Sequence, residues 1–248
     1  MNRRYWGWAL SSDPFVVESL ARTGYDAVVC DVQHGSMGFA EAARAIQLID
    51  SIGTSAMIRI SRLEIHAIPR YLDFGASGVI VATVDGPEMI ADAVQTTRYQ
   101  PEGIRSYGGA RFGLTGEPAD VSDVRPSVWA MIETRGGASA VDAIASVAGV
   151  SGLLVGPADL SRAFGLPPTH RREDSKWNRA VADVVEISER RGIRSCMTAA
   201  NGEDAAYWLD QGFTDVAISS DLGHLRVALA QELSIAKGEQ SSRIEFEV

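Results

Sequence analysis

Short apolar runs recur along the chain, and longer stretches with helical periodicity separate them. The eight runs are Trp6–Leu10, Ala27–Val32, Ala56–Ile60, Gly78–Val84, Val128–Ile132, Gly152–Val155, Ser195–Thr198 and Asp215–Ser219. The periodicity predicts helices over Phe39–Asp50, Pro87–Thr97, Ala138–Val147, Asn178–Arg191 and Glu203–Gln211. Continuous apolar strands that alternate with amphipathic helices indicate a parallel sheet covered by helices.

Eight strand–helix units are the number found in a (β/α)8 barrel, so we expect an α/β protein with a TIM-barrel fold. The chain has 248 residues, which is long enough for one such barrel, and we expect residues 1–248 to form a single domain. A doubly wound open sheet is the alternative. Its Gly-x-Gly-x-x-Gly signature is missing after the first strand, which favours the barrel.

The composition narrows the range of partners. The net charge is −9, and no basic patch suits nucleic acid or an anionic membrane. No signal peptide or membrane-spanning run is visible, and we expect a cytoplasmic enzyme. Cys30 and Cys196 both lie in apolar runs and are expected to be buried thiols rather than a disulfide or a metal pair.

Two carboxylates stand where apolar runs end. Glu133 closes one run, and Asp159 follows the next in the turn Gly156-Pro-Ala-Asp159, at 159 − 133 = 26 residues' distance, about one βα unit. Neighbouring parallel strands would bring both acids to one edge, roughly 5 Å apart in strand spacing. Mg²⁺, Mn²⁺ and Co²⁺ all suit two carboxylates with open water positions, so we expect one of these ions. Two helix-capping acids are the structural alternative.

Further polar residues end other strands, and barrel chemistry gathers at those ends. His34 follows the second run and is a candidate acid–base residue, with Asp73 or Asp31 as the carboxylate that orients it. Arg59 ends the third run and suits a carboxylate or an oxyanion, although it could instead be a surface residue paired with Glu64.

Two other segments bear on the site. Free backbone N–H groups of Ala158 and Asp159, at the expected start of a helix, can hold a substrate carboxylate. Residues Tyr99–Pro126, which include Arg105 and Arg111, form a long segment that covers the site, reaches a neighbouring subunit or is simply solvated. The polar tail from Lys237 onward is expected to contribute little.

With these residues the chain resembles the HpcH/HpaI aldolase family from about Trp6 to Leu229. The matching pieces are Asp31-Val-Gln-His-Gly35, Arg59, Arg98-Tyr-Gln-Pro-Glu-Gly-Ile-Arg105, Ile132-Glu-Thr-Arg135 and Gly156-Pro-Ala-Asp-Leu-Ser161. The resemblance implies a barrel of the phosphoenolpyruvate/pyruvate type whose last helix swaps between partners, in a homo-oligomer that is often a hexamer, a trimer of dimers. It also implies Glu133 and Asp159 as metal ligands, His34 and Asp73 as a proton-handling dyad, and Arg59 as the oxyanion-stabilising residue.

Two positions depart from the family pattern. Met131 stands where many relatives have Gln, at a position that can touch the oxo acid, and Thr198 stands at a pocket position that is often Leu. The loop around Arg111 is also shorter than in close relatives. The polar Thr198 suggests a donor such as hydroxypyruvate beside pyruvate.

The resemblance therefore predicts a class II aldolase that cleaves or forms 4-hydroxy-2-oxo acids, from pyruvate or hydroxypyruvate and an aldehyde, through a metal-bound enolate. Lys176 and Lys237 are the only lysines, and neither ends a core strand, which argues against a Schiff-base aldolase. A carbon–carbon lyase for CoA thioesters, of the citrate lyase or malyl-CoA lyase type, is the enzymatic alternative. A non-catalytic metabolite-binding barrel is the alternative from another class.

Overall fold

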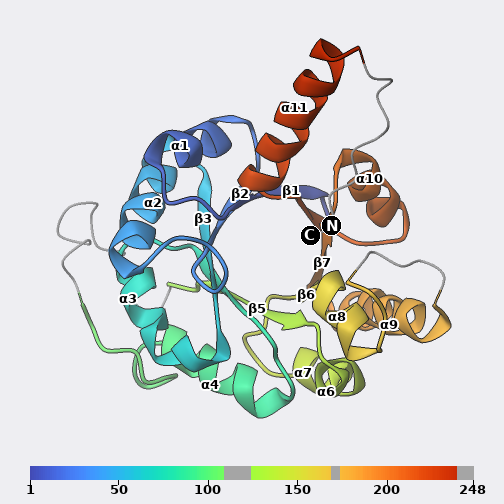
Figure 1. The fold of residues 1–248 in the computed structure, drawn as a ribbon. Coiled ribbons are helices and arrows are strands. Elements are labelled where there is room, and N and C mark those ends of the chain that lie inside the picture. The colour runs from blue at the N-terminus through green and yellow to red at the C-terminus, as the bar shows by residue number, and fades with distance from the viewer. Residues whose placement is uncertain (109–123, 169–173, 239–248) are drawn as a thin grey trace.

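The computed structural model describes residues 1–108, 124–168 and 174–238. Within these ranges eight parallel strands close into a barrel, in which each strand pairs with the next and β8 pairs with β1 (Figure 1). The strands are β1 (Arg4–Ala9), β2 (Ala27–Asp31), β3 (Ser55–Ile60), β4 (Gly78–Val81), β5 (Ser127–Ile132), β6 (Gly152–Val155), β7 (Arg194–Ala199) and β8 (Asp215–Ile218). The predicted barrel is confirmed, and its closure excludes the open doubly wound sheet.

Helices surround the barrel (Figure 1). They are α1 (Pro14–Arg22), α2 (Phe39–Ile52), the 3-10 helix η1 (Arg62–Ala67), α3 (Ile68–Asp73), α4 (Pro87–Thr97), α6 (Arg135–Ser139), α7 (Val141–Ala145), α8 (Pro157–Ala163), α9 (Ser175–Arg191), α10 (Gly202–Asp210) and α11 (Asp221–Ala236). Gly53 and Gly192 end α2 and α9 in the left-handed conformation, with φ values of 89° and 68°.

One predicted helix is wrong in its bounds. The segment Ala138–Val147 forms two short helices, α6 and α7, that meet at Ala140. The first begins early because the Thr134 side chain accepts a hydrogen bond from the Gly137 N–H. The backbone also packs closely there, since a Cβ on Gly137 would lie 2.3 Å from the Val84 carbonyl oxygen.

Strand side chains alternate between two apolar clusters. One cluster includes helix residues and fills the space between the sheet and the helices. The other cluster contains residues from all eight strands. Because it contains no helix residues, it lies inside the barrel. Its centre holds Trp6 and Trp129 in an edge-to-face pair 4.7 Å apart, and Gly152 leaves room for the Trp129 ring. Polar residues lie beyond this apolar middle layer at both ends of the barrel, among them Asp31, Arg59 and Glu133 at one end and Ser55 and Ser127 at the other.

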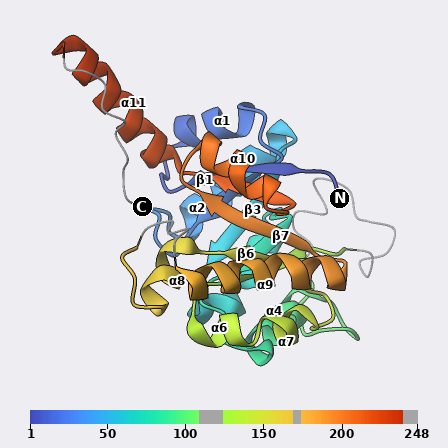
Figure 2. The same ribbon diagram turned by 90° about the vertical axis from the view of Figure 1, so that its right-hand side faces the viewer.

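Helix α11 stands away from the barrel that precedes it. Figure 2 shows it projecting outward, and within the described residues its principal packing partner is β1. Exposed apolar side chains follow its length: Leu222, Leu225, Val227, Leu229, Leu233 and Ile235. In a helix packed on its own barrel such side chains would be buried.

The segment Tyr99–Pro126 joins α4 to β5, so its described ends lie at the amino ends of the strands. Arg125 borders a hollow at that end. Arg111 and the rest of residues 109–123 lie outside the described residues, as does the polar tail beyond residue 238. Cys30 and Cys196 are buried free thiols, as expected. In the described part of the chain no helix is long and apolar enough to cross a membrane.

Candidate active site at the carboxyl ends of the strands

The carboxyl ends of the strands direct a set of polar side chains into the barrel mouth. Each lies two positions beyond a residue of the interior apolar cluster and therefore faces inward: Asp31 after Val29, Arg59 after Met57, Glu133 after Met131 and Thr198 after Cys196. Asp31, Arg59 and Glu133 are buried there, at 0%, 7% and 2% exposure. Charged groups this deeply buried need partners or a ligand.

Only one of the two carboxylate oxygens of Glu133 has a hydrogen-bond partner among the described residues. Its Oε1 accepts a hydrogen bond of 2.6 Å from the Thr83 N–H, whereas its buried Oε2 has no partner. Gly156 lies against that oxygen, since a Cβ there would be 2.3 Å from Oε2. Thr83 has a φ of 52°, a strained conformation that aims its N–H at the carboxylate.

Burial raises the pKa of Glu133 to about 7. The Thr83 hydrogen bond and the charge of Arg59 oppose that rise, while the negative charges of Asp159 and Asp31 add to it. Asp159 is exposed in the first turn of α8, and its effect on Glu133 places the two carboxylates in electrostatic range.

A divalent cation fits this arrangement. It would neutralise two mutually repelling carboxylates and give the unpartnered Oε2 of Glu133 a ligand. Within the described ranges no three His, Cys, Asp or Glu side chains gather as a metal site. Hard divalent cations have six or more coordination positions, so a cation held by Glu133 and Asp159 would keep positions for water or substrate.

Arg59 is fixed from two sides. Its Nε donates to Asp31 Oδ1 at 3.0 Å, and its Nη2 forms an ion pair with Asp31 Oδ2. Its guanidinium lies over the Trp8 ring, 5.1 Å from the centroid, and the Trp8 indole N–H donates to Asp31 Oδ2 at 3.0 Å. The remaining Nη1 points toward the Met131 sulfur at 3.9 Å. The alternative of a surface Arg59 paired with Glu64 is wrong, because Glu64 caps η1 through Ser61.

The Asp31 carboxylate pairs with Arg59 rather than with the imidazole of His34. Burial raises the pKa of Asp31, but the hydrogen bond and charge of Arg59, with the Trp8 indole, outweigh it and lower the pKa below the usual value. Asp31 also accepts hydrogen bonds from the backbone N–H groups of Gln33 and His34, at 3.0 and 3.1 Å. These bonds fix the turn that carries His34, and the His34 side chain is exposed.

The structure does not bring His34 and Asp73 together within one chain. Asp73 ends α3, and its carboxylate pairs with Arg105 at 2.7 Å. Arg105 is buried and lies over the Tyr99 ring, 4.6 Å from the centroid. Among the described residues no hydrogen bond joins the His34 ring to Asp73.

The remaining predicted site residues surround the mouth. Met131 is buried beneath Glu133 and contacts Arg59. Thr198 is half-buried near the end of β7, where its hydroxyl donates to the Val155 carbonyl at 3.3 Å. Ala158 and Asp159 lie in the first turn of α8, whose N–H groups have no acceptor within the helix.

Sequence reasoning missed Trp8 and Thr83. Trp8 appears in the sequence as an ordinary apolar strand residue, and only the register that places Asp31 beside Arg59 shows its role. Thr83 acts through its backbone, and no feature of Ala82-Thr-Val84 signals a positive φ.

The chain is similar to proteins of known activity. Residues 4–228 match the family described as HpcH/HpaI aldolase/citrate lyase. The chain is 32% identical over 225 residues to a 5-keto-4-deoxy-D-glucarate aldolase of Klebsiella pneumoniae, covering 89% of this chain and 87% of that protein. It is also 32% identical over 234 residues to a hydroxypyruvate/pyruvate aldolase of Rhizorhabdus wittichii, covering 93% of each.

A solved structure shares the architecture. The crystal structure of the citrate synthase SbnG superposes with a TM-score of 0.84 at 29% identity, covering 96% of this chain and 94% of that chain. Similar barrels in this group therefore carry more than one carbon–carbon bond chemistry.

Proposed function

The chain belongs to the HpcH/HpaI aldolase/citrate lyase family, and from that membership we propose that it is a divalent-metal-dependent aldolase. Its reaction is the reversible cleavage of 4-hydroxy-2-oxo acids into a 2-oxo acid and an aldehyde. One observation carries the proposal: the buried Glu133 carboxylate, with an unpartnered oxygen, lies within electrostatic range of Asp159 and of the fixed cation Arg59.

Glu133 and Asp159 hold the cation, for which Mg²⁺, Mn²⁺ and Co²⁺ are all suitable. When bound, the cation supplies Lewis-acid polarisation of the substrate's oxo group. The orphaned Oε2 of Glu133 supports this assignment, because a buried carboxylate oxygen without a donor is costly unless a ligand meets it.

Arg59 stabilises the negative charge that develops on the oxo oxygen. A pre-oriented guanidinium is most effective in a buried site, because it needs no reorganisation during the reaction. Asp31 and Trp8 supply that orientation and leave Nη1 directed toward the interior beside Met131. The N–H groups of Ala158 and Asp159 hold the substrate carboxylate.

In cleavage His34 takes the proton of the C4 hydroxyl as the C3–C4 bond breaks to release the aldehyde, and it returns a proton to C3 of the oxo acid; addition runs in reverse. Its exposed side chain stands at the rim of the mouth on a turn fixed by Asp31. Asp73 can join it as the orienting carboxylate only from a second subunit, because Asp73 and its partner Arg105 lie at the amino end of their own barrel and His34 lies at the carboxyl end. A mixture of His34→Ala and Asp73→Ala chains tests this route, because only a dyad across subunits restores activity in mixed oligomers.

The donor includes hydroxypyruvate as well as pyruvate. Thr198 places a hydroxyl at the mouth where it can meet a polar C3 substituent, and one relative is named a hydroxypyruvate/pyruvate aldolase. Thr198→Leu should lower the ratio of kcat/KM for hydroxypyruvate to that for pyruvate. An unchanged ratio would remove Thr198 from donor selection.

The protein assembles as a homo-oligomer, a hexamer built from three dimers, in which α11 packs on a partner. The exposed apolar residues of α11 support this arrangement, because they have no cover within their own barrel (Figure 2). Leu229→Glu with Leu233→Glu should reduce the mass measured by light scattering, and an unchanged mass would argue against packing through α11.

The test of the activity is exchange of the pyruvate methyl protons for deuterium, followed by NMR. Exchange should require a divalent cation, stop with EDTA and return with Mn²⁺. Glu133→Ala should abolish it, and substantial metal-independent exchange would refute the assignment. A screen of CoA thioesters beside aldehydes tests the lyase alternative, which the resemblance to a citrate synthase keeps relevant.

A further inference from the structure

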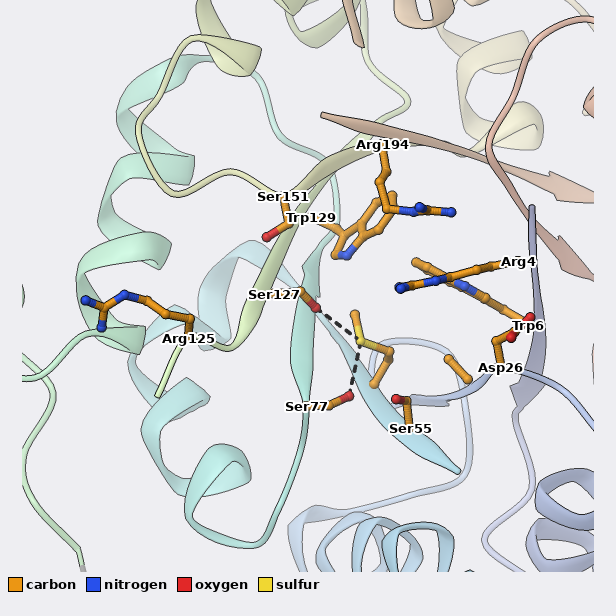
Figure 3. Close-up of a pocket in the computed structure, with 12 residues that line it drawn as sticks. Arg4, Trp6, Asp26, Ser55, Ser77, Arg125, Ser127, Trp129, Ser151 and Arg194 are labelled. Atoms are coloured by element: carbon orange, nitrogen blue, oxygen red, sulfur yellow. Dashed lines mark hydrogen bonds between the residues drawn. The ribbon is translucent and has the colours of Figure 1, made fainter. Parts of the chain in front are cut away.

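We propose a second binding site, for a small organic oxyanion such as a phosphate monoester, at the amino end of the barrel. A cavity of about 450 Å³ opens there (Figure 3), a volume in the range of small-molecule sites. Its rim comes from the first residues of the strands, including Arg4, Ser55 and Ser127. Ser127 and Glu133 are six residues apart along β5, so roughly 20 Å separates this cavity from the proposed active site.

Arg4 supplies a guanidinium without a hydrogen-bonded partner, although the carboxylate of Asp215, its neighbour across β1 and β8, lies within electrostatic range. Figure 3 shows its side chain extending into the cavity. Among the described residues no hydrogen bond or ion pair engages its guanidinium, and Asp26, on the same rim, is already bonded to the Tyr5 N–H. A guanidinium facing a concave surface is well suited to bind an oxyanion through two parallel hydrogen bonds.

Two other arginines border the cavity and have partners of their own. Arg194 donates to the buried Asp215 at 2.7 Å and to the Asn2 carbonyl at 2.8 Å, which holds it rigidly at the rim. Arg125 pairs with Glu102 at 3.1 Å and points away from the cavity in Figure 3. The charge available to a ligand is therefore chiefly that of Arg4, with Arg194 as a fixed neighbour.

Serine hydroxyls complete the polar rim. The Ser127 hydroxyl bonds the Met57 sulfur at 3.5 Å, and a thioether is a weak acceptor that an oxyanion would readily replace, whereas the Ser77 hydroxyl already donates to the Ala56 carbonyl at 3.0 Å. Ser151 accepts a hydrogen bond from the Val128 N–H, which leaves its own hydrogen for a ligand. Hydroxyl donors around a guanidinium favour an anion over a neutral ligand.

The floor of the cavity is apolar. Trp6, Trp129 and Met57 line it below the charged rim. An inorganic ion would leave this surface unused, whereas an organic oxyanion can place its anionic group against Arg4 and its apolar part over the indoles. Phenyl phosphate combines both features and is the probe of choice.

Titration calorimetry with phenyl phosphate, inorganic phosphate and phenol tests the proposal. Phenyl phosphate should bind more tightly than either fragment. Arg4→Gln should weaken its binding about tenfold or more, since a charge-assisted hydrogen bond is lost. Arg3→Gln is the matched control, because Arg3 is the adjacent residue and pairs outside the cavity with Asp210 at 3.1 Å.

A Glu133→Gln chain serves as the control for the opposite mouth and should bind phenyl phosphate as the unaltered chain does. Three outcomes would overturn the proposal: no binding at millimolar phenyl phosphate, equal weakening in Arg4→Gln and Arg3→Gln, or loss of binding in Glu133→Gln. Thermal unfolding of each variant checks that a loss of binding is not a loss of fold.

Discussion

The substitution Glu133→Gln separates the metal-ligand role of this residue from a purely structural one. Burial raises the pKa of Glu133 from 4.5 to about 7. Between these values the folded, metal-free chain keeps a proton that the unfolded chain releases, so its free energy of unfolding falls as pH rises through this window. Each pH unit contributes about 1.4 kcal/mol, which gives on the order of 3 kcal/mol lost by pH 8.

Gln keeps the acceptor for the Thr83 N–H and removes the buried charge. Metal-free Glu133→Gln should therefore be more stable than the unaltered chain at pH 8, by up to about 3 kcal/mol, and nearly equal to it at pH 4.5. Excess Mn²⁺ should stabilise only the unaltered chain, because the variant has lost a ligand. Protons compete with the cation for Glu133, so Mn²⁺ affinity should weaken as pH falls below about 7.

Urea unfolding at both pH values, with EDTA and with Mn²⁺, measures these differences. Glu189→Gln, at an exposed position in α9, is the matched control and should change neither quantity. The reasoning is refuted if Glu133→Gln destabilises the metal-free chain equally at both pH values, or if Mn²⁺ stabilises the variant as strongly as the unaltered chain.

Three further substitutions or reagents test the surroundings of the site. Asp31→Asn leaves Arg59 buried without its counter-ion and should cost about 3–5 kcal/mol of unfolding free energy, measured in urea. Trp8→Phe keeps an aromatic ring but removes the indole N–H that donates to Asp31, so it should lower the free energy of unfolding by about 1 kcal/mol. It should also lower kcat more than it changes KM. A variant as stable as the unaltered chain would contradict the role of that hydrogen bond. Burial raises the pKa of Cys30 to about 12 and that of Cys196 well above its usual value, so a thiol reagent at pH 8 should label both only as fast as the chain unfolds.

The barrel and much of its mouth could be predicted from the sequence, because parallel strands buried on both faces leave continuous apolar runs. The same pattern shows where each strand ends, which located Arg59 and Glu133 without a structure. The pairing of Asp31 with Arg59 could not be predicted, because it depends on the register between β2 and β3. A sequence contains no direct record of strand register.

Other features depend on contacts between distant segments. Asp73 pairs with Arg105, 32 residues away, and nothing local distinguishes that partner from His34. The early start of α6 follows from one cap and from close backbone packing at Gly137. The projection of α11 was expected only through the family resemblance, since its apolar residues would equally suit a helix packed on its own barrel.

The apolar middle layer of the barrel has a consequence for the order of events in catalysis. Trp6, Trp129 and Leu154 seal the interior, so no solute crosses from one end of the barrel to the other. Both products of a cleavage must then depart through the opening by which the substrate arrived. In the proposed binding mode the oxo acid lies deeper, against Glu133 and Arg59, so we expect the aldehyde to leave first and the oxo acid to inhibit competitively against the uncleaved substrate.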